Sequence, residues 1–369
     1  MAPGLGPARR RYDPRVLTIL PEAWFEQQPT LLLLLMGVVA IVAVVKGADW
    51  LVSAAAGLAE RLGLPQVVIG ATIVSLGTTS PEAAVSVMAA WAGEAGIALG
   101  NGVGSIIVDT GLILGVGMVL TRVEARAVVL NRQGWIQLGA GGLLCALCYG
   151  LFLWRGDAAV LGRSVGLLLV ALLVAYLLVS VHWSRRTPSE EQGATAGARE
   201  PRTGPGRSVL ALLGIGGLGL AVVVLSGDAL VTSASELAMR WGVPSVVLAA
   251  TLVAFGTSMP ELVVGLTAIR RGHTGLLLGN IIGADILNVL FVVGASALAQ
   301  PLPIVGPAAE APWQHLLLQL HLPVMLIVLV LLRLFMGPAI KRGYFARWMG
   351  VPLLVIYVAY VAVQLATIG

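Results

Sequence analysis

The chain has 369 residues, of which 58% are hydrophobic and only 11% are charged. Soluble proteins carry about 25% charged residues, so this composition excludes an ordinary soluble globule and favours an integral membrane protein. The net charge of +5 comes from basic residues placed between apolar segments, so it does not indicate nucleic-acid binding.

Ten segments of the chain are long and apolar enough to be membrane helices, which need about 20 mainly apolar residues. The first of them reads as a retained helix, not a signal peptide, because no small-residue cleavage site follows it. We therefore predict an all-α integral membrane protein with ten transmembrane helices. The predicted segments are 31–56, 66–91, 97–120, 134–154, 159–183, 208–235, 244–269, 275–299, 314–334 and 350–368.

The ten segments divide five and five around a polar linker. An N-terminal tail (1–30) precedes a first five-helix repeat (31–183), and a cytoplasmic linker (184–207) rich in Arg, Glu, Gly and Pro separates it from a second five-helix repeat (208–369). Five is an odd number, so the second repeat must enter the membrane from the opposite side. Two inverted five-helix repeats are typical of secondary transporters.

The placement of basic residues predicts the orientation. With the N-terminus outside, most of the 23 lysines and arginines fall in cytoplasmic segments, where such residues are enriched. The arginines of the N-terminal tail argue the other way. We predict a multi-pass protein of the cell or inner membrane, surrounded by lipid, with both its N-terminus and its C-terminus outside.

One stretch of sequence occurs twice. The segment 70–115 aligns without a gap on 249–294, and apolar composition alone would not match Gly, Pro, Glu and Asn together. The chain is therefore built from two copies of one unit. The matched residues include Gly77, Thr78, Pro81, Glu82, Gly100, Asn101 and Gly104 in the first copy and Gly256, Thr257, Pro260, Glu261, Gly279, Asn280 and Gly283 in the second.

The second and seventh predicted helices carry GTTSPE and GTSMPE in mid-membrane. Pro81 and Pro260 remove a backbone donor, and a glycine four residues earlier weakens the same turn. We expect a kinked or unwound segment whose carbonyls face the protein interior. Glu82 and Glu261 follow these breaks, and an ionised carboxylate at the bilayer centre costs at least about 2.5 kcal/mol, so it normally marks an ion or proton pathway.

The third and eighth predicted helices add further polar side chains. Asn101, Ser105 and Asp109 are spaced by four residues and therefore share one helix face. Carboxylate, hydroxyl, amide and carbonyl oxygens are hard ligands, which suit calcium or sodium better than zinc or copper. The matching positions in the second copy are Asn280, Ala284 and Asn288.

These motifs resemble the alpha-repeats of the sodium/calcium exchanger family, within the cation/calcium antiporter superfamily. GTTSPE is followed by GNGVGSIIVD in the first copy, and GTSMPE by GNIIGADILN in the second. The resemblance implies ten helices, antiport, and a central site on the second, third, seventh and eighth helices. The residues that correspond to the ion ligands of the family are Thr78, Thr79, Glu82, Ser105 and Asp109, then Thr257, Ser258, Glu261 and Asn288, with the carbonyls of Ser75 and Ala254.

The sequence departs from the family pattern at two places. Family members carry Asn in the first copy and Asp in the second where this chain has Asp109 and Asn288. Ala284 stands where the family has a serine hydroxyl. We expect the swap to keep three acids in the site, and the alanine to weaken or remove one outer sodium position.

The function predicted from the resemblance is secondary active antiport of Ca²⁺ for Na⁺ by alternating access, without a cofactor or catalytic residue. Three sodium ions would neutralise the three acids, and one calcium would do so if one acid held a proton. The alternative is an antiporter of the same fold that exchanges H⁺ for Ca²⁺ or another divalent cation, which Ala284 favours. The first and sixth helices would move, with Gly37, Gly47 and the run 214–220 providing smooth surfaces.

An intramembrane hydrolase could use paired acids, but no metal-ligand signature such as H-E-x-x-H occurs, so we predict that the protein is not an enzyme. A cation channel would lack strict coupling between two ions. Asp49 and Asp228 lie near predicted helix ends, where an ion pair or a helix cap is as plausible as a role in transport.

Overall fold

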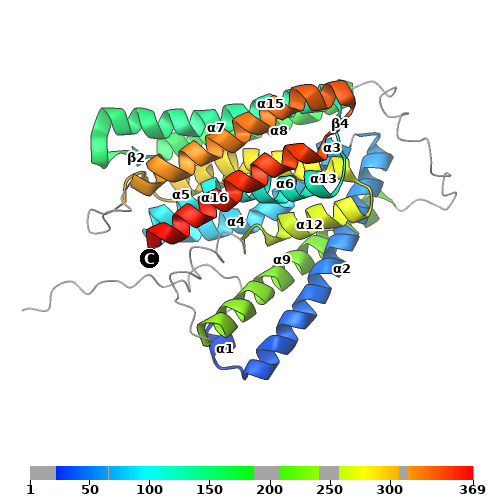
Figure 1. Ribbon diagram of the computed structural model, residues 1–369, viewed down its shortest axis with the longest axis horizontal. Coiled ribbons are helices and arrows are strands. Elements are labelled where there is room, and N and C mark those ends of the chain that lie inside the picture. Colours follow the sequence, from blue (N-terminus) through cyan, green and yellow to red (C-terminus); the bar gives the residue numbers. More distant parts are fainter. Residues whose placement is uncertain (1–21, 65, 187–207, 241–256, 307–314, 369) are drawn as a thin grey trace, which may run out of the picture.

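The computed structural model describes residues 22–64, 66–186, 208–240, 257–306 and 315–368, and these residues form a mostly helical molecule (Figure 1). Within these ranges, eight helices are long and apolar enough to cross a membrane by length and composition. The protein is therefore a multi-pass integral membrane protein, as its composition predicted.

Most of the helices are continuous. They are α1 (Glu22–Glu26), α2 (Thr30–Leu62), α7 (Ala127–Arg155), α8 (Arg163–Arg186), α9 (Val209–Arg240), α12 (Met259–Arg270), α15 (Leu322–Arg342), which follows the π-helical turn Leu317–His321, and α16 (Gly350–Ile368).

Three further membrane segments each change from α-helix to π-helix and back. The first consists of α3 (Gln66–Ile69), the π-helix η2 (Gly70–Val74) and α4 (Ser75–Trp91). The second consists of α5 (Ala95–Ile106), η3 (Ile107–Leu114) and α6 (Gly115–Leu120), and the third of α13 (Thr274–Leu287), η8 (Asn288–Val293) and α14 (Gly294–Ala299).

The predicted segments correspond closely to the observed helices. The segment predicted at 159–183 begins later, at Arg163, because Val160–Leu161 forms a short strand. The segment predicted at 244–269 is described only from Thr257, as its first part lies outside the described residues. The count of ten helices in two inverted repeats therefore stays a prediction.

Two pairs of two-residue strands join loops that are distant in the sequence. β1 (Val123–Glu124) pairs antiparallel with β4 (Tyr344–Phe345), so that Val123 faces Phe345. β2 (Val160–Leu161) pairs antiparallel with β3 (Leu302–Pro303). Each pair ties a loop of the first half of the chain to a loop of the second.

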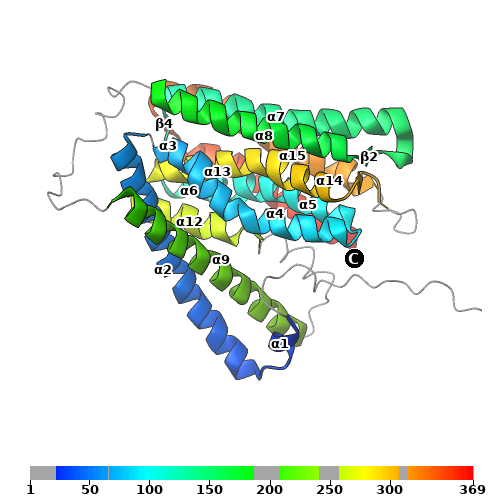
Figure 2. The same cartoon turned by 180° about the vertical axis from the view of Figure 1, so that it is seen from behind.

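The helices lie in layers, with the most buried ones in the middle. In Figures 1 and 2, α7, α8 and α15 lie on one side of α4, α5 and α13, and α2 and α9 lie on the opposite side. In an apolar 18-residue stretch of each segment, 94% of the residues are buried in Thr274–Ala299 and 78% in Ala95–Leu120, against 17% in Val209–Ala234. The two segments that carry the GN motifs therefore form the core.

The helices α2 and α9 run antiparallel and pack against each other through glycines. A Cβ atom on Gly47 would lie 2.8 Å from the carbonyl oxygen of Gly219, and one on Gly219 would lie 2.7 Å from that of Gly47. Only glycine permits so close an approach of two backbones. Gly214 and Gly217 have nothing within 4 Å, whereas Gly216 and Gly219 contact α2.

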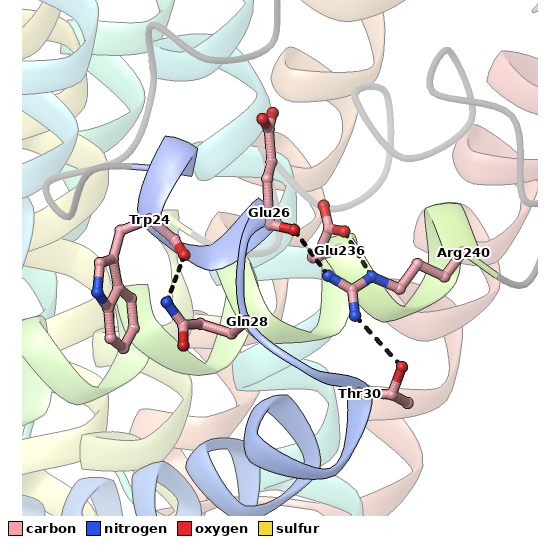
Figure 3. Close-up of polar contacts among 6 residues, drawn as sticks. All are labelled: Trp24, Glu26, Gln28, Thr30, Glu236 and Arg240. Carbon is pink, nitrogen blue, oxygen red and sulfur yellow. Dashed lines mark hydrogen bonds and ion pairs between the residues drawn. The ribbon is translucent and has the colours of Figure 1, made fainter.

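At the end of the α2–α9 pair, Arg240 joins three segments, as Figure 3 shows. Its guanidinium donates hydrogen bonds to Glu236 Oε1 at 2.7 Å, Thr30 Oγ1 at 3.2 Å and the carbonyl oxygen of Glu26 at 3.0 Å. These bonds fasten the last turn of α9 to α1 and to the first residue of α2. The far ends of the two long helices are thus held together.

Asp49 is not near a helix end, because α2 continues to Leu62. Its Oδ1 accepts a hydrogen bond from Arg271 Nε at 3.0 Å, and Arg271 also donates to Ser53 Oγ at 2.5 Å. Arg271 follows α12 directly, so Asp49 forms an ion pair between α2 and the α12–α13 turn. Asp228 likewise lies within α9, not near its end.

Candidate ion-binding site

Three acids from three different membrane segments are completely buried. Glu82 lies in α4, Asp109 in η3 and Glu261 in the first turn of α12, and each has a relative exposure of 0%. In the described part of the chain, no lysine or arginine forms an ion pair with any of them. Isolated buried charges are unfavourable, so acids placed in this way need a cation or a proton.

Hydroxyl groups from both halves of the chain surround Glu82. Its Oε1 accepts hydrogen bonds from Ser105 Oγ of α5 at 2.8 Å and from Ser258 Oγ, beside α12, at 2.9 Å. Its Oε2 is buried and has no hydrogen-bond partner. The carboxylate is therefore held in place through one oxygen while the other is free to act as a ligand.

Glu261 has a comparable environment. Its Oε1 accepts a hydrogen bond from Thr79 Oγ1 at 3.4 Å, and its Oε2 is buried without a partner. Thr79 is the repeat counterpart of Ser258, which bonds to Glu82 at 2.9 Å. Each half of the chain thus supplies a hydroxyl to the glutamate of the other half.

The asparagines of the GN motifs show the same exchange between halves. Thr78 Oγ1 donates to Asn280 Oδ1 at 3.3 Å, and Thr257 Oγ1 donates to Asn101 Oδ1 at 2.9 Å. Asn101 Nδ2 further donates to Ser86 Oγ at 2.9 Å. Reciprocal contacts of this kind are what a pseudo-two-fold relation between the copies predicts.

Of the two expected forms around Pro81, kinked or unwound, the structure does not show the unwound one. α4 continues through Pro81 from Ser75 to Trp91, and the irregular stretch is the π-helix η2, which ends at Val74. Proline is tolerated inside a membrane helix when neighbouring helices and local π adjustments satisfy the freed backbone groups. In the second copy, Ser258 is non-helical and α12 begins at Met259 with Pro260 in its first turn, while most of the preceding segment lies outside the described residues.

Asp109 and Asn288 both lie in π-helical segments, which sequence patterns did not reveal. Asp109 is in η3 and Asn288 begins η8. Both side chains are fully buried, and none of their polar atoms has a hydrogen-bond partner. Single π-helical turns within α-helices occur frequently at functional sites.

Three further positions named from the sequence are Ser75, Ala284 and Ala254. The carbonyl oxygen of Ser75 accepts a hydrogen bond from Thr78 Oγ1 at 3.3 Å, beside the cluster. Ala284 is buried in α13 and, being alanine, contributes no hydroxyl. Ala254 lies outside the described residues.

A fourth buried acid was missed by the sequence reasoning. Asp285 of α13 is 2% exposed, and its Oδ2 accepts hydrogen bonds from Thr110 Oγ1 and Gln137 Nε2, both at 2.5 Å. Its counterpart in the first copy is Ile106, so a search for residues that match between the copies passes over it. An acid in an otherwise apolar helix was the signal that could have found it.

The cluster as a whole presents oxygen atoms without partners in a buried centre. Native proteins rarely leave buried polar atoms unsatisfied unless they have a function, and cations that prefer hard ligands bind carboxylate, hydroxyl and amide oxygens. The buried side-chain oxygens without a hydrogen-bond partner in this centre are Glu82 Oε2, Asp109 Oδ1 and Oδ2, Glu261 Oε2, Asp285 Oδ1 and Asn288 Oδ1.

The chain is similar in sequence to membrane proteins, among them a sodium/calcium exchanger. The family model described as sodium/calcium exchanger protein matches residues 32–182 and 211–366. The sodium/calcium exchanger MaX1 of Methanosarcina acetivorans is 30% identical over 90% of this chain and 97% of its own length. The inner membrane protein YrbG of Escherichia coli is 34% identical over 72% of this chain and 79% of its own.

A solved structure agrees with these sequence matches. The sodium-calcium exchanger NCX_Mj, soaked with Na⁺ and Ca²⁺, superimposes with a TM-score of 0.72 at 26% identity, covering 90% of this chain and 98% of the other. The family is one of transporters, not of enzymes. The chain, with two matches to the family model and a core of buried acids, belongs to the sodium/calcium exchanger family and is a cation/calcium antiporter.

Proposed function

We propose that this antiporter exchanges Ca²⁺ for Na⁺ at a single central site reached by alternating access. The observation that carries the proposal is the group of three buried acids, Glu82, Glu261 and Asp109, which lack basic partners in the described part of the chain and keep free carboxylate oxygens. The names of MaX1 and NCX_Mj, both sodium/calcium exchangers, support the choice of ions.

The charges of the acids explain why the two cargoes would compete. Three sodium ions neutralise three ionised carboxylates, and one calcium ion neutralises them when one acid holds a proton. Occupation by both cargoes at once would leave excess positive charge in a buried, low-dielectric centre, which is costly. Competition for the same oxygens would therefore couple the two fluxes without any direct contact between the ions.

The proposed ligands fall into three chemical groups. Carboxylates carry the charge, hydroxyls and amides complete the coordination, and main-chain carbonyls add oxygens that need no deprotonation. The proposed set is Glu82, Glu261 and Asp109; Thr78, Thr79, Ser105, Thr257, Ser258 and Asn288; and the carbonyls of Ser75 and Ala254.

We also propose the orientation and the moving part. Both termini would lie outside, and the first five-helix unit (31–183) would be related to the second (208–369) by inversion across the linker 184–207. Since α2 and α9 pack on each other through Gly47 and Gly219, they would move together as one pair against the other helices.

A second coupling ion has one observation in its favour. Ala284 of the second copy corresponds in the repeat to Ser105 of the first and supplies no hydroxyl. Ser105 Oγ donates a hydrogen bond to Glu82 Oε1 at 2.8 Å. The loss of one hydroxyl from the second half weakens a sodium position and favours the alternative, exchange of H⁺ for Ca²⁺ or another divalent cation.

Uptake of ⁴⁵Ca²⁺ into proteoliposomes tests both versions. Vesicles loaded with sodium are diluted into sodium-free buffer at equal pH, and a parallel set carries a pH gradient without sodium. Uptake that requires internal sodium is the expected result. Uptake driven only by the pH gradient would establish the proton-coupled alternative, and no uptake in either set would show that calcium is not the cargo.

A further inference from the structure

Asp285 has no role in the exchange proposed above, yet it is a buried acid close to the site. It lies in α13 one turn before Asn288 and is 2% exposed. Because its repeat counterpart is Ile106, it belongs to the second half alone. A site made only of residues that recur in both copies would therefore lack this carboxylate.

The contacts of Asp285 leave half of its carboxylate unused. Thr110 Oγ1 from η3 and Gln137 Nε2 from α7 both donate to Oδ2. Oδ1 is buried without a hydrogen-bond partner, and no basic side chain among the described residues forms an ion pair with this acid. Two neutral donors on one oxygen do not neutralise a buried negative charge.

A second carboxylate without hydrogen bonds lies nearby. Asp109 immediately precedes Thr110 in η3, and both of its oxygens are buried without partners. Thr110, the next residue after Asp109, donates to Asp285 Oδ2, so the two acids lie in one packed region of η3 and α13. Two ionised acids in one buried region repel strongly in a low dielectric unless a cation lies between or beside them or one of them holds a proton.

We propose that Asp109 and Asp285, with the hydroxyl oxygen of Thr110, hold one additional sodium ion beside the matched site, an inference that rests on the proposed sodium-coupled exchange. The geometry favours a monovalent ion, because only one oxygen of Asp285 remains unused and Ca²⁺ takes six to eight oxygen ligands. The fourth acid would then raise the sodium capacity of this chain by one ion above that of its three matched acids.

Counting bound ions tests the proposal directly. Purified wild-type protein and Asp285→Asn are compared by equilibrium binding of ²²Na⁺ at saturating concentration and, separately, of ⁴⁵Ca²⁺. Asparagine keeps the size of the side chain and an oxygen that accepts from Thr110 and Gln137. The expected result is one sodium fewer per protein in the variant, with an unchanged number of bound calcium ions.

Other outcomes are equally decisive. Equal sodium counts in the two proteins, with calcium binding intact, would overturn the proposal and reduce Asp285 to an anchor for α7 and η3. If Asp285→Asn does not fold, Thr110→Val replaces it: it removes one ligand oxygen and no charge, so the affinity for one sodium ion should fall at least tenfold, and unchanged affinity overturns the proposal. Wild-type protein in which sodium does not displace calcium would instead refute the exchange itself.

Discussion

At the scale of single residues, the site is built from contacts that cross between the two halves of the chain. Ser258 donates to Glu82 and Thr79 donates to Glu261, while Thr257 donates to Asn101. A residue of one copy therefore depends on the other copy for its orientation. Glu82 also accepts from Ser105 of its own half, so the contact across the halves is one of two that orient this carboxylate.

Removing the charge of either glutamate should abolish exchange. Glu82→Gln and Glu261→Gln should each reduce sodium-driven ⁴⁵Ca²⁺ uptake at least tenfold, equal to about 1.4 kcal/mol or more, because each removes one of three charges that the cargo neutralises. Ser80→Ala is the matched control, since Ser80 is exposed and, within the described ranges, its hydroxyl bonds to the Leu76 carbonyl one turn before it. Near-normal uptake in either glutamine variant would argue against the site.

The position of the third acid can be tested by moving it. Asp109→Asn should lose sodium-driven calcium uptake, since two acids remain. The double variant Asp109→Asn with Asn288→Asp restores three acids in the arrangement that family members carry, and we expect it to recover at least a third of wild-type uptake. A double variant that folds but is as inactive as Asp109→Asn would show that the acid must stay in η3.

The sequence predicted the site residues that occur in both copies of the repeat better than those that occur in one. Glu82 and Glu261 stood out because each has a counterpart and no basic partner nearby in its helix. Asp285 has no acidic counterpart and was missed, although it is buried. The ion-pair partner of Asp49 could not be read from the chain either, because Arg271 lies far away in sequence and meets it only through the packing of α2 against the α12–α13 turn.

At the scale of elements, the main difference between prediction and structure is the form of the irregular helices. Gly and Pro in GTTSPE predicted a kinked or unwound segment; α4 runs through Pro81 without unwinding, and the π-helix η2 precedes it. A π-helical turn and an unwound turn draw on the same residue types, so composition does not separate them. Which one forms depends on the helices that pack against the segment.

The contact between α2 and α9 gives a prediction about stability. Gly219→Ala should destabilise the protein by about 1–3 kcal/mol, the usual cost of overpacking, because the new methyl group would lie 2.7 Å from the Gly47 carbonyl oxygen. Thermal unfolding in detergent measures the change. Gly214→Ala in the same helix is the control, since nothing lies within 4 Å of its added methyl, and it should be neutral or stabilising; equal effects of the two would contradict the packing.

At the scale of the whole molecule, the α2–α9 pair lies on one side of the core helices α4, α5 and α13 (Figures 1 and 2). In an apolar 18-residue stretch of Val209–Ala234, 17% of the residues are buried, against 94% in such a stretch of Thr274–Ala299. Arg240 fastens the pair at one end (Figure 3), and the Asp49–Arg271 ion pair ties α2 to the α12–α13 turn. An exposed ion pair of this kind contributes about 0–1 kcal/mol, which is small enough to break during a transport cycle.

Two disulfides should distinguish movement of the pair from movement within it. A Cβ on Gly216 would lie 3.4 Å from that of Ala54, and one on Gly227 would lie 3.9 Å from that of Met259, close to the usual 3.5–4.5 Å of disulfides. The first bond, between α9 and α2, should preserve calcium exchange. The second, between α9 and α12, should reduce it at least tenfold until a reductant is added.

The cross-linking experiment has its own controls. Cys145 and Cys148 are free and buried, so both are replaced by alanine in the background protein. Each single-cysteine variant treated with oxidant reports effects other than cross-linking. Full exchange with the α9–α12 bond formed would show that the pair does not move against α12, and loss of exchange with the α2–α9 bond would show that the two helices must slide past each other.

The architecture was largely predictable because hydropathy and repetition are strong signals in a membrane protein. Most predicted segments fall on observed helices, and the least exposed ones carry the repeated GN motifs. The layering was not predictable, since Leu and Val face lipid and protein alike. Nor did any pattern predict that two-residue strands such as β1 and β4 would join loops of the two halves.

The central claim is that calcium and sodium occupy the same buried oxygens in turn. Equilibrium binding of ⁴⁵Ca²⁺ to purified protein, repeated at rising sodium concentrations with choline as the balancing cation, tests it most directly. We predict that sodium displaces calcium completely and competitively, with steep dependence on sodium, and that Glu82→Gln and Glu261→Gln both lose calcium binding. Calcium that stays bound at saturating sodium, or that binds normally to both glutamine variants, would contradict a shared site.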